Sequence, residues 1–134
     1  NTTRNAQILR ENMKDAGIEA SPADAVHHIV PSTSQRNWAV RARQTLWEKF
    51  GIDINAAENG VFVPKNVNAH LNNVRYEEAV FKALEEAQTR QEAIGILQKI
   101  ADRIRLTGTY PQEEQDETGY LDYAIGRREL SLFQ

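Results

Sequence analysis

The chain contains the seven-residue run Ala25-Val26-His27-His28-Ile29-Val30-Pro31 (AVHHIVP). Its apolar and β-branched members predict a short strand, and the closing proline ends the run because proline cannot continue a strand ladder. His27 and His28 both lie inside the run. We therefore expect a strand that carries two adjacent imidazole groups.

A second β-prone run, GVFVP at residues 60–64, follows Asn59, and we expect it to pair with the first strand. Apolar residues at helical spacing predict helices over residues 3–15, 36–50, 68–87 and 91–106. The predicted fold class is α+β. It is a mainly helical domain built around a strand-strand-helix unit.

The composition is that of a globular domain, with 40% hydrophobic and 26% charged residues among 134. This length predicts one domain over residues 1–134, with a motif core at about residues 25–87. No apolar run approaches the roughly 18 residues that a membrane span needs, so we expect no membrane partner. Cysteine is absent, which excludes disulfides and cysteine-ligated zinc. Any metal ion must bind His, Asn, Asp, Glu or water.

Charge is unevenly distributed along the chain. The formal net charge of -3 argues mildly against wholesale attraction to nucleic acid. The helix expected over residues 36–50 is nevertheless basic, and it is the best candidate for a phosphate-facing surface. Residues 108–119 predict an acidic loop, and residues 120–134 predict an apolar segment that docks on the body or on a partner.

The three histidines of the chain lie in two places, at His27-His28 and at His70. Imidazole is a common metal ligand and the natural general base near neutral pH, so two adjacent histidines can divide those roles. A ligand on a strand and another on a packed helix would hold an ion from two elements. Asn59, just before the second strand, is expected to brace the loop by hydrogen bonding to backbone.

The expected strand carries a geometric constraint. Successive side chains of a strand point to opposite faces of the sheet. His27 and His28 therefore reach one pocket only if the strand end twists and the substrate lies across it.

Three blocks, AVHHIVP, GIDINAAENGVFVP and NAHLNNVRYEEAV, resemble the AHH nucleases of the HNH/endonuclease VII superfamily. The resemblance spans roughly residues 9–104. It implies a ββα-metal nuclease in which His27 holds one divalent cation, His28 is the general base, His70 is a second metal ligand and Asn59 is structural. Many members are toxin domains at the C-terminal end of large secreted bacterial proteins. A chain that does not begin with methionine fits such an origin.

The chain departs from similar sequences in two places. They commonly read Ala-His-His where this chain has Val26-His27-His28, and they often carry a second histidine shortly after the helix histidine. Here that region reads His70-Leu71-Asn72-Asn73-Val74. Three explanations are open: the Asn73 amide oxygen fills the vacant ligand position, water fills it, or a histidine has been replaced to disarm a toxic protein.

The expected reaction is hydrolysis of a phosphodiester, with Arg41, Arg43 or another basic residue binding a neighbouring phosphate. The ion would be Mg, Mn, Zn or Ni. The resemblance implies a nonspecific DNase toxin that is delivered from a bacterium as part of a larger protein and acts in the target cytoplasm. A cognate immunity protein is the implied partner. The alternatives are a catalytically degenerate HNH-like module that binds nucleic acid or protein, and a hydrolase that acts on RNA or a nucleotide.

Overall fold

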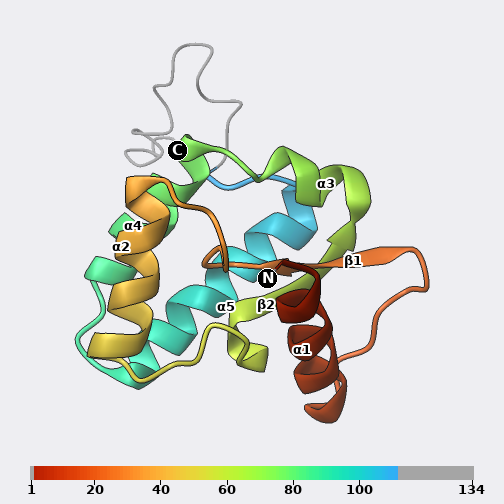
Figure 1. The fold of residues 1–134 in the computed structure, drawn as a ribbon, viewed down its shortest axis with the longest axis horizontal. Coiled ribbons are helices and arrows are strands. Elements are labelled where there is room, and N and C mark those ends of the chain that lie inside the picture. Colours follow the sequence, from red (N-terminus) through yellow and green to blue (C-terminus); the bar gives the residue numbers. More distant parts are fainter. Residues whose placement is uncertain (1, 112–134) are drawn as a thin grey trace.

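The computed structural model describes residues 2–111, so most of the predicted acidic loop and all of the predicted docking segment 120–134 lie outside the described residues. Helices surround a small antiparallel sheet (Figure 1), which confirms the α+β fold class. In chain order the elements are α1 (Thr2–Asp15), β1 (Asp24–His28), α2 (Asn37–Gln44), the π-helical turn η1 (Thr45–Lys49), the 3-10 turn η2 (Ala57–Asn59), β2 (Gly60–Pro64), α3 (Lys65–His70), α4 (Val74–Glu85) and α5 (Arg90–Thr107).

The two predicted strands do pair, antiparallel and in a register that sets His27 opposite Val61 and His28 opposite Gly60. The sheet buries both of its faces. On one face Val26 and Phe62 pack with Leu9 and Met13 of α1. The opposite face contributes its valines to the larger core, which also contains residues of α2, α4 and α5.

Gly60 permits the close approach of α1 to the sheet. A Cβ atom at this position would lie 2.8 Å from Cδ1 of Leu9 and would also strike Met13. This packing therefore requires glycine at position 60, although its extended backbone angles are ones that any residue adopts. Because Gly60 is the partner of His28 in β1, α1 is drawn against the strand end that carries the histidines.

The helix predicted over residues 68–87 is wrong as a single element, because the chain breaks after His70 and starts again at Val74. The break has a local cause. Asn73 has extended backbone angles, and its side-chain oxygen accepts the N–H of Tyr76 at 2.9 Å, which makes Asn73 the N-cap of α4. The helix predicted over residues 36–50 likewise divides into α2 and the π-helical turn η1, where Trp47 keeps 62% of its surface exposed.

The longest helix, α5, has a capping residue at each end. The Thr89 hydroxyl accepts the N–H of Glu92, and Gly108 ends the helix in the left-handed region with φ of 77°. Among residues 2–111 no helix has the length and apolar character to span a membrane.

Candidate active site

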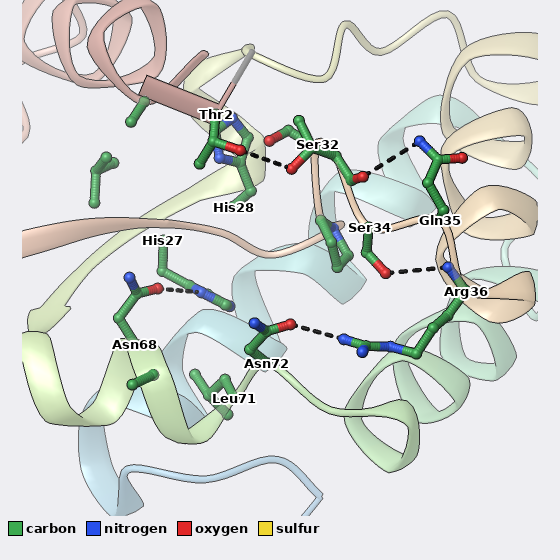
Figure 2. A pocket seen from close by; sticks show the side chains of 15 residues that line it. Thr2, His27, His28, Ser32, Ser34, Gln35, Arg36, Asn68, Leu71 and Asn72 are labelled. Atoms are coloured by element: carbon green, nitrogen blue, oxygen red, sulfur yellow. Dashed lines mark hydrogen bonds between the residues drawn. The ribbon is translucent and has the colours of Figure 1, made fainter. Parts of the chain in front are cut away.

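A pocket of about 720 Å³ lies beside β1 and is lined by both His27 and His28. Residues of α1, of the loop 31–36 and of α3 complete its wall, whereas no residue of β2 is among its lining residues. Figure 2 shows the two histidines with Asn68 and Asn72 from the α3 region and Ser34 and Arg36 from the loop. The pocket therefore follows the side of β1 that faces away from β2.

The two histidines approach this pocket from opposite faces of the sheet. His28 lies on the α1 side, where its ring contacts Asn55, which in turn bonds Asn5 of α1. His27 lies on the other side, against Asn68 of α3 and Tyr76 of α4. The alternation expected of a strand is thus retained, and both side chains share one pocket because the pocket wraps the open side of β1.

The His28 ring is held by one hydrogen bond, in which Nε2–H donates to Oδ1 of Asn55 at 2.8 Å. The Asn55 amide is oriented in turn, because its Nδ2 donates to Oδ1 of Asn5 at 3.1 Å. With the ring proton on Nε2, the lone pair of a neutral His28 lies on Nδ1, which has no hydrogen-bond partner among residues 2–111. Partial burial lowers the pKa of His28, so the neutral form prevails at neutral pH.

His27 is only 7% exposed, and both of its ring nitrogens have close neighbours. Nδ1 lies 2.9 Å from Oδ1 of Asn68, and Nε2 lies 2.9 Å from the hydroxyl oxygen of Tyr76. The Tyr76 hydroxyl donates to the backbone oxygen of Ile29 at 2.5 Å. Burial lowers the pKa of His27 to about 4, so the ring is neutral at neutral pH and carries a single N–H.

This chain of contacts is one proton short. Three polar contacts link Ile29, Tyr76, His27 and Asn68, but the tyrosine hydroxyl and a neutral imidazole supply only two protons. Two oxygens at 2.5 Å require a proton between them, so Tyr76 donates to Ile29, and the single N–H of His27 serves either Tyr76 or Asn68. With the proton on Nδ1 the ring donates to Oδ1 of Asn68; with the proton on Nε2 it donates to Tyr76 and turns its Nδ1 lone pair toward Asn68. In the second tautomer, rotation of the Asn68 amide or a bound cation relieves the contact between the two lone pairs.

Asn59 is fully buried and bonds the loop that follows β1. Its Oδ1 accepts the N–H of Val30 at 2.8 Å, and its Nδ2 donates to the backbone oxygens of Val30 at 3.1 Å and Ile54 at 2.9 Å. Its own backbone oxygen accepts the N–H of Ile29 at 2.8 Å. Asn59 thus fixes the backbone just beyond the histidines and has no direct place in the pocket.

The structure does not bring His70 and Asn73 into the pocket with His27. His70 is the exposed last residue of α3, and the Asn73 oxygen is engaged by Tyr76 as the cap of α4. Val74, which closes the segment where similar sequences often carry a second histidine, is 51% exposed. The described residues also contain no group of three His, Cys, Asp or Glu side chains that could hold a metal. The ligand assignment of His70 and Asn73 finds no support in this geometry.

Arg41 and Arg43 are also absent from the pocket lining, because each is engaged elsewhere. The Arg41 guanidinium lies over the rings of Trp38 and Phe81, at 5.1 and 4.6 Å from their centroids. Arg43 donates to the backbone oxygens of Pro31 at 2.9 Å and Ser34 at 2.7 Å, and desolvation lowers its pKa. The arginine that lines the pocket is Arg36, at the start of the same helix.

Sequence reasoning thus missed four residues that contact the histidines or line the pocket: Arg36, Asn55, Asn68 and Tyr76. Asn55 and Asn68 each lie within a sequence block that resembles the family, and that location indicates that they are close to the site. Nothing in the sequence marked either asparagine as a neighbour of a histidine, because that pairing depends on how α1 and α3 pack on the strands.

An antiparallel strand pair followed by a short helix, with adjacent histidines at the end of the first strand, defines a small ββα domain of the HNH type. The chain belongs to the AHH family, a nuclease family of the HNH/ENDO VII superfamily with a conserved AHH, whose family model matches residues 8–105. Searches of curated proteins and of solved structures found no match. Within the AHH motif this chain retains both histidines, with Val26 before them.

Proposed function

We propose that this domain is a metal-dependent endonuclease that hydrolyses phosphodiester bonds, with His28 as the general base. One observation carries the proposal: Asn55 holds the His28 ring by Nε2, which leaves the Nδ1 lone pair available in a pocket. A general base needs a neutral, oriented imidazole near neutral pH. Membership of a nuclease family supports the same reaction.

In the proposed reaction Nδ1 of His28 accepts a proton from water as the water oxygen attacks phosphorus. The ring becomes an imidazolium, and the Nε2–H bond to Asn55 strengthens because that donor now belongs to a cation. Asn55 therefore acts as a positioning residue. The amide fixes which nitrogen takes the proton, as outer partners of catalytic histidines do.

The family implies a divalent cation, and the pocket offers a pair of atoms that fits one. In the tautomer with the proton on Nε2, Nδ1 of neutral His27 and Oδ1 of Asn68, 2.9 Å apart, are both free to act as ligands. One imidazole nitrogen and one amide oxygen suit an ion that keeps much of its water shell, such as Mg²⁺ or Mn²⁺, better than a closed zinc site. When bound, the ion supplies positive charge beside the phosphate and the departing oxygen.

The proposed substrate is DNA, cut without regard to sequence. The pocket lining consists mainly of hydroxyl, amide and imidazole groups, with a single arginine and no acidic side chain among the described residues. Such groups commonly contact sugar and phosphate, and contacts of that kind carry no base information directly. The alternative substrates for the same phosphodiester hydrolysis are RNA and a nucleotide.

The family resemblance also suggests a biological role for the domain. The domain would be a toxin that is delivered from a bacterium as part of a larger protein and acts in the cytoplasm of a target cell. The producing cell would then need an immunity protein that covers the pocket or an adjacent surface. Co-expression with the product of a neighbouring reading frame, followed by a cleavage assay of the purified complex, tests this part.

A panel of substrates tests the proposed activity directly. Purified protein is incubated with supercoiled plasmid, structured RNA or nucleotides in Mg²⁺, Mn²⁺, Zn²⁺ or Ni²⁺, with EDTA as the control. Metal-dependent nicking of plasmid supports the endonuclease. The rival function is a non-catalytic binding module, which the lack of a three-ligand cluster among residues 2–111 favours. Tight nucleic-acid binding without cleavage in any ion would establish that module.

A further inference from the structure

Arg36 is the charged side chain of the pocket, among the described residues that line it. Its neighbours in the wall are the hydroxyl residues Ser32, Thr33 and Ser34, and no Asp or Glu among the described residues shares the lining. The Ser34 oxygen accepts the backbone N–H of Arg36 at 3.3 Å and keeps its own O–H as a donor, whereas the Thr33 hydroxyl bonds that of Thr2 at 3.0 Å. That chemistry matches an anionic oxygen ligand.

The Arg36 guanidinium is held in place from behind by a buried acid. Nε and Nη2 donate to the two carboxylate oxygens of Glu77, at 2.8 and 2.9 Å, and Nη2 also donates to Oδ1 of Asn72 at 2.7 Å. Glu77 is only 1% exposed, and Arg36 is its ion-pair partner. Because a buried carboxylate is costly without its partner, this pair fixes the orientation of the guanidinium.

The side chain of Arg36 remains 44% exposed despite these bonds. Its third nitrogen, Nη1, has no partner among residues 2–111, so two N–H donors remain on the fork. Figure 2 shows the side chain extended toward Asn72 along the pocket wall. Because Glu77 already fixes the guanidinium through two hydrogen bonds, Nη1 is a preorganised donor for a ligand.

A second arginine shapes the wall without entering the pocket. Arg43 bonds the backbone oxygens of Pro31 and Ser34, the two ends of the hydroxyl-bearing segment. The hydroxyl groups of Ser32, Thr33 and Ser34 are thereby presented from a fixed loop. The positive charge of Arg43 also lies behind that loop and offsets the carboxylate of Glu77.

We propose that Arg36 binds a backbone phosphate of the nucleic acid, through Nη1 and with the help of the Ser32–Ser34 hydroxyls. This inference rests on the proposed function. It adds where the nucleic-acid backbone would lie relative to His27 and His28. Glu77 and Arg43 are positioning residues in this subsite, the first for the guanidinium and the second for the loop. Arg41, which stacks on Trp38 and Phe81, has no part in it.

The test measures binding and needs no cleavage. A labelled DNA duplex is titrated in EDTA, over a range of salt, with the His28→Ala protein and with variants of it that carry further changes. Arg36→Gln combined with Glu77→Gln removes the cation and leaves no buried acid unpaired. We expect the dissociation constant to rise roughly tenfold. The slope of log affinity against log salt concentration should become shallower by about one, the contribution of one phosphate contact. Arg41→Gln is the matched control from the same helix, and we expect less than about a twofold change.

Arg36→Lys is a second variant, which keeps a cation beside Glu77 and so preserves the fold. It lacks the forked nitrogens, and we expect binding to weaken severalfold. Circular dichroism and thermal unfolding verify that each variant is folded. Unchanged affinity and salt slope in both folded Arg36 variants would overturn the phosphate subsite. Loss of binding in these variants supports the subsite even if the wild-type protein cuts no substrate, which separates this inference from the proposed activity.

Discussion

Nε2 of His28 lies 2.8 Å from Oδ1 of Asn55, and Asn55 is itself bonded through three further atoms. Its Nδ2 donates to Asn5, its backbone N–H donates to the Asp53 carboxylate at 2.7 Å, and its backbone oxygen accepts from Asn12 at 2.8 Å. The residue is 8% exposed. A side chain fixed at so many atoms can hold a neighbouring ring in one tautomer.

Asn55→Ala therefore reduces cleavage by roughly 10- to 100-fold, the usual effect of losing an outer partner of a catalytic histidine. The bond to Asn55 raises the pKa of His28 against the effect of burial, so its removal moves the acid limb of the pH-rate profile to lower pH. Steady-state assays across pH measure both effects, with exposed Asn66→Ala as the control. An unchanged profile in folded Asn55→Ala would contradict the positioning role.

The acceptor pair His27 and Asn68 predicts how metal affinity responds to substitution. Asn68→Asp replaces an amide oxygen with a carboxylate and should tighten Mn²⁺ binding roughly tenfold, whereas Asn68→Ala should weaken it by a similar factor. Calorimetric titration with Mn²⁺ alone measures both. Asn66→Asp on the exposed side of α3 is the charge-matched control. His70→Ala should leave the affinity unchanged, and a loss there would restore His70 as a ligand.

Asn59 predicts a stability effect rather than a loss of chemistry. Asn59→Ala leaves the buried N–H of Val30 and the backbone oxygens of Val30 and Ile54 without their side-chain partner. The expected loss in the free energy of unfolding is about 3 kcal/mol, since each unpaired buried group costs roughly 1 to 3 kcal/mol. Urea unfolding measures it against wild type. If Asn59→Ala lowered the free energy of unfolding no more than the exposed control Asn66→Ala does, these side-chain bonds would not stabilise the loop.

His27 predicts a dependence of stability on pH. Burial lowers its pKa to about 4, while the unfolded chain keeps the ordinary value of 6.5. Above pH 6.5 both states are neutral, and between 6.5 and 4 only the unfolded chain takes up the proton. The free energy of unfolding therefore falls as pH drops through this window, by roughly 3 kcal/mol in all at about 1.4 kcal/mol per unit.

Urea unfolding in EDTA at several pH values between 7 and 4 measures this fall. His28 also has a lowered pKa, so wild type is compared with His27→Gln, and the difference between the two isolates His27. A parallel decline in both proteins would show that His27 is not the titrating group.

Much of the fold followed from local sequence signals. The strand predicted at residues 60–64 is confirmed at both ends, where Gly60 is its first residue and Pro64 its last. The helix predicted over residues 91–106 is confirmed within one residue at each end, since Thr89 and Gly108 are strong caps. Such features depend on neighbours in sequence, which a single sequence displays.

The partners of the histidines did not follow from sequence, because they depend on packing. Asn73 donates through its side chain to the backbone oxygen of His70 and caps α4 through its side-chain oxygen, and His70 lies at the exposed end of α3. The prediction that Arg41 or Arg43 faces phosphate finds no support in the structure for a similar reason. Which arginine of a basic helix reaches a pocket depends on aromatic and backbone acceptors that lie elsewhere in the chain.

The most direct test of the account is single-turnover cleavage of plasmid by wild type and His28→Ala, with Mn²⁺ binding measured on both proteins. We expect His28→Ala to fold, to bind the ion as wild type does, and to cut at least roughly 100-fold more slowly, the low end for loss of a general base. A His28→Ala protein that cuts as fast as wild type would contradict the assignment of His28 as the base.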